Sequence, residues 1–261
     1  AFASLAAALV TGADVRLPGR EGQRIVRFAL EPPAGEPARE AELLATGLAP
    51  EPSGGTRFQA RGGGIGAEVS LRVPGRHNVA NALAALGGLS LTSADVEACA
   101  KALADFPGVA RRLELKGEAR GARIYDDYAH HPTEVAATLE AARDLEPRRL
   151  IVAFQPHLYS RTKALATEFG AALAAADEVA VLDVYPAREE PVGRLAGVSG
   201  MMVATAAADH ARGGRVWWLP TAELAAQALR PRLADGDVLI TIGAGDVYKL
   251  AEALVDGSEG R

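Results

Sequence analysis

The chain has 261 residues, of which 49% are hydrophobic and 23% are charged, a composition typical of a globular protein and not of a disordered chain. No uninterrupted apolar run approaches the roughly 18 residues that a membrane span requires, and the length suits about two domains. The formal net charge of -5, with Lys and Arg scattered along the chain, argues against a nucleic-acid partner and favours small-molecule partners.

The start of the chain and its cysteine usage bear on where the protein works. AFASLAAALV resembles the apolar core of a signal peptide, but no basic residues precede it, and its spacing fits an amphipathic helix. Because the chain also begins without Met, we expect a fragment that starts inside a helix. The one cysteine, Cys99, lies in an alanine-rich helical pattern, which favours a buried structural thiol in a reducing cytoplasm.

Residues 11–73 carry β-rich patterns separated by connections that are dense in Gly and Pro. We expect strands at Arg24–Phe28, Thr56–Ala60 and Ala67–Val73. The glycine run at 62–64 lies between two of them and predicts a hairpin. No Gly-Lys-Thr or Gly-Lys-Ser follows this run, which argues against a phosphate-binding loop.

Two helices are expected next, from Asn78 to about Leu89 and from Ser93 to Asp105. Pro107-Gly108 then breaks the helical pattern. We place a domain boundary there, which gives domains at 1–108 and 109–261.

From Val109 onward, short apolar runs alternate with amphipathic helical stripes. This rhythm predicts a doubly wound α/β domain with a mostly parallel sheet and a ligand crevice at the carboxyl ends of its strands. The expected strands are Ala122–Asp127, Leu150–Phe154, Glu178–Leu182, Val216–Leu219 and Val238–Ile242. The helical stripes are Val135, Leu139 and Ala142, then Leu165, Phe169 and Leu173, then Val247, Leu250, Ala251 and Leu254.

The first motif with chemical content is PGRHNVANA at residues 74–82, where a strand meets a helix. A helix amino terminus offers free N–H groups and a positive dipole end, and an Asn amide can both donate to and accept from an adenine edge. The alternative is that Asn78 is only an N-cap and His77 a surface loop residue. The chemistry alone favours neither.

Arg111 and Arg112 form the second motif, just past the break at Pro107-Gly108. An arginine fork matches phosphate oxygens bidentately, and beside a hinge it can reach a phosphate that is bound on another domain. For an isolated pair of arginines, a solvated surface position is the commoner explanation.

The third motif, YDDYAHHPTE at residues 125–134, ends a strand in two carboxylates and two imidazoles before a proline opens a helix. Such strand ends hold ligand groups in α/β folds. Because side chains alternate along a strand, only one of Asp126 and Asp127 can reach a given ligand. Metal binding by His130 and His131 is a weaker alternative, since no third ligand has helpful spacing.

The fourth motif, FQPHLYSRT at residues 154–162, also lies at a strand end. The titratable imidazole of His157 and the cation of Arg161 suit recognition of a carboxylate. The alternative is that Ser160 is an N-cap and that the other two side chains are merely exposed. Four of the five histidines lie at expected element junctions, and this joint placement favours a site.

PGRHNVANA, GVARRLE and YDDYAHHPTEV, in this order and spacing, resemble the carboxyl-terminal signature of the Mur ligase family. The resemblance covers most of the chain and is poorest across residues 11–66. With FQPHLYSRT, the chain resembles the branch of the family that uses L-alanine. The resemblance implies that ATP phosphorylates the carboxylate of UDP-N-acetylmuramate and that the amine of L-alanine attacks the acyl phosphate. That reaction belongs to cytoplasmic peptidoglycan synthesis.

The resemblance also implies roles for individual residues on the nucleotide side. Asn78, with His77 and Asn81, would contact the adenine of ATP. Arg112 would approach the phosphates as a catalytic residue, and Asp127 would contact the ribose.

On the other side of the reaction, the resemblance implies that His130, His157 and Arg161 line the amino-acid and acyl-phosphate region. The two histidines would be catalytic, and Arg161 would hold the carboxylate of L-alanine. Some relatives carry a basic residue where this chain has Leu158, which leaves the details of carboxylate binding open.

The phosphate loop and the Mg²⁺ ligands of the family do not occur in this sequence, so we expect them in an upstream part. The resemblance therefore makes 1–108 the end of the central ATP-binding domain and 109–261 the Rossmann-like carboxyl-terminal domain. We expect such a fragment to be inactive by itself.

Three other functions remain as alternatives. A sister ligase that attaches a recycled peptide to the same sugar nucleotide shares the DDYAHHPTE region, but we expect a different loop there in place of FQPHLYSRT. A non-catalytic Rossmann-like nucleotide-binding module is the second. An NAD-dependent oxidoreductase is the third, although Tyr248 stands where the fingerprint that begins at Gly243 needs its third glycine.

Overall fold

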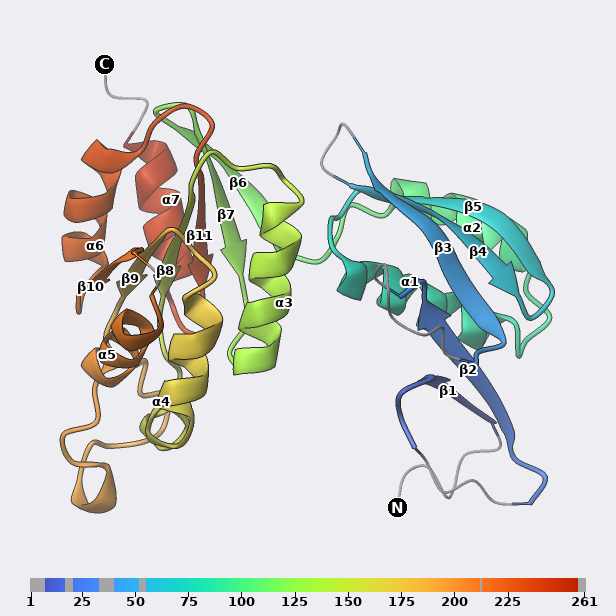
Figure 1. Ribbon diagram of the computed structural model, residues 1–261, viewed down its shortest axis with the longest axis horizontal. Coiled ribbons are helices and arrows are strands. Elements are labelled where there is room, and N and C mark those ends of the chain that lie inside the picture. Colours follow the sequence, from blue (N-terminus) through green and yellow to red (C-terminus); the bar gives the residue numbers. More distant parts are fainter. Residues whose placement is uncertain (1–7, 17–20, 33–39, 52–54, 212, 258–261) are drawn as a thin grey trace. The chain divides into compact units, whose positions relative to one another are not determined.

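The computed structural model describes residues 8–16, 21–32, 40–51, 55–211 and 213–257 (Figure 1). The chain divides into two units, Ala1–Gly108 and Val109–Arg261, which we call the N-terminal and C-terminal units. None of the helices in the described part of the chain has the length and apolar character needed to cross a membrane.

The N-terminal unit contains a five-stranded sheet with strands in sequence order. Its strands are β1 (Ala8–Gly12), β2 (Arg24–Leu30), β3 (Leu43–Pro50), β4 (Thr56–Gly62) and β5 (Ile65–Leu71). The first three run parallel, whereas β3, β4 and β5 pair in antiparallel fashion. The hairpin predicted at residues 62–64 is confirmed, because β4 and β5 pair up to Gly62 and Ile65. All three glycines there have positive φ angles, a conformation that glycine adopts without strain.

Two helices, α1 (Arg76–Leu89) and α2 (Val96–Ala102), follow the sheet, and a short 3-10 helix (Leu103–Asp105) continues the second. Both helices pack on the core formed by residues such as Phe58, Leu83 and Leu86. Cys99 is half-buried beside that core. The expected helices are thus confirmed with small shifts of their ends.

The helix expected for the first ten residues is wrong over residues 8–10, which belong to β1, while residues 1–7 lie outside the described part. Leu9 and Val10 pair with Ile25 and Val26 of β2. An Ala- and Leu-rich segment has high helix propensity, but a neighbouring strand with unpaired backbone groups overrides it. β3 was also missed, since Gly47 interrupts its apolar pattern where the pairing with β4 shifts register.

The C-terminal unit contains a six-stranded sheet of order β10-β9-β8-β11-β7-β6. Its strands are β6 (Glu114–Ala119), β7 (Ala122–Asp127), β8 (Leu150–Phe154), β9 (Glu178–Val181), β10 (Arg215–Trp218) and β11 (Val238–Ile242). All five expected strands are confirmed, and they are parallel. β6 was missed because it is a polar antiparallel edge strand without a continuous apolar run.

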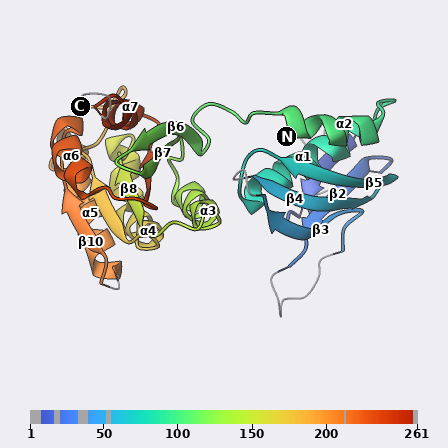
Figure 2. The same ribbon diagram turned by 90° about the horizontal axis from the view of Figure 1, so that it is seen from above.

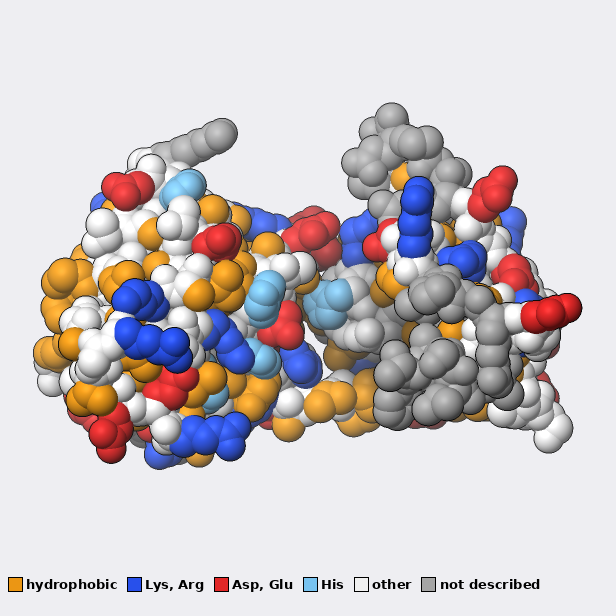
Figure 3. Space-filling view, turned by 90° about the horizontal axis from the view of Figure 1, so that it is seen from below, with side chains coloured by type: hydrophobic (Ala, Val, Ile, Leu, Met, Phe, Trp, Pro, Cys, Tyr) orange, Lys and Arg blue, Asp and Glu red, His pale blue; other side chains and the backbone are white. Residues whose placement is uncertain are grey.

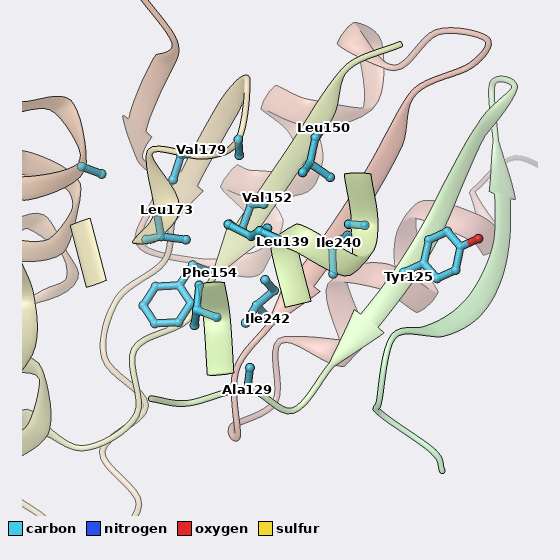
Figure 4. Packing of buried hydrophobic residues seen from close by; sticks show 14 of the residues in the cluster. Tyr125, Ala129, Leu139, Leu150, Val152, Phe154, Leu173, Val179, Ile240 and Ile242 are labelled. Carbon is cyan, nitrogen blue, oxygen red and sulfur yellow. The ribbon is translucent and has the colours of Figure 1, made fainter. Parts of the chain in front are cut away.

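Helices cover both faces of this sheet, as the doubly wound fold requires (Figure 2). On one face lie α3 (Pro132–Arg143), α4 (Tyr159–Leu173) and α5 (Gly200–His210), and on the other lie α6 (Ala222–Leu229) and α7 (Tyr248–Asp256). Figure 4 shows how Leu139 and Leu173 from the helices meet Val152, Phe154 and Ile240 from the strands. The predicted α/β fold is confirmed.

Candidate functional site

The candidate site lies at the carboxyl ends of four parallel strands of the C-terminal unit. Its loops follow β7 (128–131), β8 (155–158), β9 (182–189) and β11 (243–247). β8 and β11 are neighbours, yet the helices that follow them cover opposite faces of the sheet. The two loops therefore leave the sheet in opposite directions, and α/β folds bind their ligands at such topological switch points.

Arg111 acts as a clamp on the loop that follows β11. Its guanidinium donates to Asp126 at 2.9 Å and to carbonyl oxygens of the 243–245 loop at 2.6 and 3.2 Å. It also lies 4.9 Å from the ring centroids of both Tyr128 and Tyr248. Since Asp126 is fully buried, this arginine neutralises a charge inside the protein. From the sequence, this pair of arginines was a candidate for phosphate binding, and the buried ion pair of Arg111 was not predicted.

Arg112, in contrast, is exposed. Its guanidinium lies 5.9 Å from the centroid of the Tyr128 ring. It is also near Glu134, whose burial opposes ionisation, but a hydrogen bond from His130 and the charges of His130 and Arg112 lower the pKa of this carboxyl. The exposed position leaves Arg112 accessible to an anionic ligand, and its contact with phosphates stays a prediction.

Asp127 is buried at the end of β7, where its carboxylate accepts three hydrogen bonds from the protein. The donors are the backbone N–H groups of Leu113 and Ala129, both at 2.8 Å, and the hydroxyl of Thr138 at 3.1 Å. Burial raises the pKa of Asp127, and these hydrogen bonds oppose that rise. The carboxylate therefore fixes the backbone just before β6 and the loop just after β7. Its contact with a ribose stays a prediction.

His130, His157 and Arg161 come together from separate segments of the chain, as the sequence predicted for a shared site. Arg161 donates to the carbonyl oxygen of His130 at 3.1 Å, and the two imidazole centroids are 6.5 Å apart. His130 is held by Glu134, which accepts from its backbone N–H at 2.9 Å. On the face shown in Figure 3, histidine side chains of this unit gather among Lys and Arg side chains.

His157 is half-buried, with its ring stacked on Tyr185 at 5.7 Å between centroids and 12° between planes. Its Nδ1 is buried and makes no hydrogen bond within the described part of the chain. Burial lowers the pKa of His157, and the positive charge of Arg161 lowers it further. The imidazole is therefore held neutral at neutral pH.

The structure corrects the alternative for this loop, in which Ser160 was an N-cap. The N-cap of α4 is Leu158, which has a φ of 71° and offers no side-chain capping bond. A left-handed conformation costs a branched residue of this kind on the order of 1 kcal/mol, and such strain concentrates at functional sites.

His131 does cap its helix, since its Nδ1 accepts from the N–H of Thr133 at 3.4 Å. Within the described ranges, no three His, Cys, Asp or Glu side chains are grouped so that they could hold a metal ion.

Gln155 is a second residue that the sequence did not single out. Its amide donates to Asp246 at 3.0 Å and accepts from the N–H of Val247 at 3.2 Å. These bonds tie the loop after β8 to the loop after β11. A Cβ at Gly243 would lie 2.6 Å from the carbonyl oxygen of Gln155, so the glycine here serves close packing and not a nucleotide.

A pocket of about 580 Å³ opens on the other face of the sheet, between α6 and α7. Gln155, Asp246, Glu223 and Lys249 are among its lining residues, whereas the residues predicted for catalysis are not. The pocket therefore does not test the roles predicted for His130, His157 and Arg112.

The predicted adenine-side residues belong to the N-terminal unit. His77 and Asn78 are half-buried, and Asn81 is exposed on α1. The N-cap alternative for Asn78 is wrong, because Gly75, with a φ of 99°, is the N-cap. The amide of Asn78 instead donates to the carbonyl oxygen of Pro74 at 2.7 Å. Residues 77, 78 and 81 share one side of the helix, since three and four positions span about one turn.

Comparisons with known proteins identify the family to which the chain belongs. Residues 111–245 match the family described as Mur ligase, glutamate ligase domain. A UDP-N-acetylmuramate–L-alanine ligase of Mycolicibacterium smegmatis is 54% identical over 185 residues, which are 70% of this chain and 37% of that relative. A ligase of the same name from Mycobacterium avium is 46% identical over 253 residues, 90% of this chain and 48% of that relative.

Solved structures show the same fold. A UDP-N-acetylmuramate–alanine ligase from Thermotoga maritima superposes with a TM-score of 0.70 at 24% identity, covering 90% of this chain and 48% of that one. A murein peptide ligase from Psychrobacter arcticus superposes with a TM-score of 0.61 at 21% identity, covering 92% and 48%. The chain thus spans less than half the length of these relatives. By its matched residues and its relatives, the chain belongs to the Mur ligase family.

Proposed function

We propose that this chain supplies the carboxyl-terminal part of an ATP-dependent ligase that joins L-alanine to UDP-N-acetylmuramate in cytoplasmic peptidoglycan synthesis. The observation that carries the proposal is that His130, after β7, meets His157 and Arg161, after β8, in a chain whose relatives bear that name. The N-terminal unit would then be the end of the central ATP-binding domain, and the C-terminal unit the whole Rossmann-like domain.

The side chains suit the amino-acid half of the reaction. The bond to His130 uses one of the five donors of the Arg161 guanidinium, and a planar fork matches a carboxylate. An amine attacks an acyl phosphate only after it loses a proton. The neutral imidazole of His157 can accept that proton, since its pKa is lowered.

On the nucleotide side, Arg112 would neutralise charge that develops on the transferred phosphoryl group. His77, Asn78 and Asn81 would contact the adenine, and Asp127 the ribose. The described residues contain no carboxylate and histidine cluster that fits Mg²⁺, so this chain is not assigned a metal ligand. Mg²⁺, when bound, would neutralise the phosphates of ATP from groups outside this chain.

The test joins this chain to the upstream part of the M. smegmatis relative and measures phosphate release from ATP in the presence of UDP-N-acetylmuramate. We expect release that depends on L-alanine and not on a peptide acceptor. Release with a tripeptide but not with L-alanine would favour the recycled-peptide ligase instead. The 261-residue chain alone is the control, and we expect no release because its sequence has no phosphate loop.

A further inference from the structure

The segment after β9 contacts the His157–Arg161 loop although neither Tyr185 nor Glu189 belongs to a recognised motif. Tyr185 donates its N–H to the carbonyl oxygen of Pro156 at 2.8 Å and accepts from the N–H of Leu158 at 3.0 Å. These two bonds form a parallel bridge across His157 and fix the backbone on both sides of it.

The side chain of Tyr185 has close neighbours on two loops. One side stacks on His157, at 5.7 Å between centroids. On another side, a Cβ placed at Gly245 would lie 2.6 Å from Cγ of Tyr185, so the 243–247 loop passes close against it. A ring with so little room to move fixes the plane of the imidazole that stacks on it.

Glu189 replaces the missing cap of α4. The N-cap residue Leu158 provides no side-chain acceptor, but the carboxylate of Glu189 accepts from the backbone N–H of Ser160 at 2.8 Å and from its hydroxyl at 2.5 Å. Both bonds satisfy the first turn of the helix, and a negative charge is favourable at a helix amino terminus. Arg161 is the next residue, so this contact sets where its side chain begins.

We propose that Tyr185 and Glu189 are the positioning residues of the amino-acid site, Tyr185 through the plane of His157 and Glu189 through the first turn of α4, which carries Arg161. The substrate named here rests on the proposed function, but the positioning itself does not. The strained backbone at Leu158 fits this role, because a left-handed residue persists only where its surroundings hold it.

The first test uses the 261-residue chain and needs no activity. An NMR titration that follows the imidazole signals of the histidines measures the pKa of His157. The ring of Tyr185 stacks on this imidazole, and the charged and titratable groups around it are those of Arg161, His130, Glu189 and Arg188. In Tyr185→Leu, loss of the ring exposes the imidazole, so its pKa should rise toward the ordinary value, whereas Tyr185→Phe keeps the ring and should change it little. An unchanged His157 pKa in Tyr185→Leu, with the remaining spectrum native, would overturn the role of Tyr185.

The second test uses the fused ligase. Tyr185→Leu and Glu189→Ala should each raise the KM for L-alanine, on the order of 10-fold to 100-fold, and leave the KM for ATP unchanged. Tyr185→Phe keeps the aromatic ring, so its KM for L-alanine should stay close to that of the unchanged ligase. Glu190→Ala, a substitution at an exposed neighbouring residue, is the matched control. Equal rises in both KM values, or no rise in either, would overturn the proposal. If phosphate release by the fused ligase does not depend on L-alanine, the proposed function is wrong. The NMR titration then still tests whether Tyr185 positions His157.

Discussion

The two ends of the C-terminal sheet both carry charged clusters, and the clusters differ in how many of their arginines are paired with carboxylates. At the amino ends of the strands, Glu178 and Asp237 are buried, and Arg149 links them through hydrogen bonds of 3.0 Å to the first and 2.5–3.1 Å to the second. Arg215 and Arg232 approach Glu178 at 3.3 and 3.6 Å. The carboxylates of this amino-end cluster are thus paired with arginines of the same unit.

At the carboxyl ends Arg111 is paired with the buried Asp126, whereas the described residues show no ion pair for Arg112 or Arg161. Arg112 is exposed, and Arg161 donates to a backbone carbonyl instead of to a carboxylate. His157 is held neutral between a ring and a cation. We therefore expect the charges at the amino ends to stabilise the fold and those of Arg112 and Arg161 to be available to a ligand, since α/β sheets bind ligands at the carboxyl ends of their strands.

The largest expected effect comes from opening the amino-end cluster. Asp237→Ala removes one of the two carboxylates that pair with Arg149, and with it two of the three hydrogen bonds that this arginine donates to carboxylates. The free energy of unfolding should fall by about 3 kcal/mol, because the buried pair is broken. Both tryptophans lie in β10, so their fluorescence during urea denaturation reports on this unit. Arg148→Ala is the control, since that arginine is 62% exposed and should cost less than about 1 kcal/mol. Equal losses of unfolding free energy in Asp237→Ala and Arg148→Ala would show that the charges of the amino-end cluster are not paired in solution.

The adjacent arginines at 111 and 112 should separate the two roles within one dipeptide. Arg112→Ala should lower turnover of the fused ligase by on the order of 10²-fold, with the unfolding free energy almost unchanged. Arg111→Ala should instead destabilise the C-terminal unit, since Asp126 would remain buried without its cation. Turnover and urea denaturation, measured on both variants, check this division. Similar profiles for the two variants would contradict it.

A smaller effect is expected from Arg161→Lys, which keeps the charge but loses the planar fork. The KM for L-alanine should rise by roughly 10-fold, and the KM for ATP should stay the same. A rise in the KM for ATP alone would mean that this loop faces the nucleotide.

The smallest effect concerns pH. Because burial and Arg161 lower the pKa of His157, the imidazole should stay neutral as the pH falls through about 6.5, the ordinary value for histidine. The kcat/KM for L-alanine should therefore begin to fall only below that pH. The free energy of unfolding should also fall as the pH drops below about 6.5, because the unfolded state then binds a proton that folded His157 does not yet bind. A decline that begins above pH 6.5 would indicate a different base.

Much of the fold could be predicted because β8 and β11 are buried on both faces and read as unbroken apolar runs, LIVAF and VLITI. β6 could not, since a polar edge strand of sequence ELKGEA has no such run. β1 was mistaken for helix because Ala and Leu carry a local signal that only its partner strand overrides.

For the site, the sequence singled out the strand-end histidines and Arg161 by position and residue type, and the structure brings His130, His157 and Arg161 together, while their roles stay predictions. Arg111, Gln155, Tyr185 and Glu189 could not be predicted, because their roles depend on partners that lie 15 to 134 positions away in the chain. One signal was present for Tyr185: it follows the end of β9 in the way that His157 follows β8. Examining the end of every parallel strand, and not only those with motifs, would have found it.

The most direct test of the contrast between the two ends exchanges one arginine at each. In the fused ligase, Arg161→Ala and Arg149→Ala are compared for kcat/KM with L-alanine and for the free energy of unfolding of the C-terminal unit. We predict that Arg161→Ala lowers kcat/KM by on the order of 10²-fold with little loss of stability, and that Arg149→Ala does the reverse. A loss of stability in Arg161→Ala as large as that in Arg149→Ala, with kcat/KM for L-alanine retained, would contradict the account.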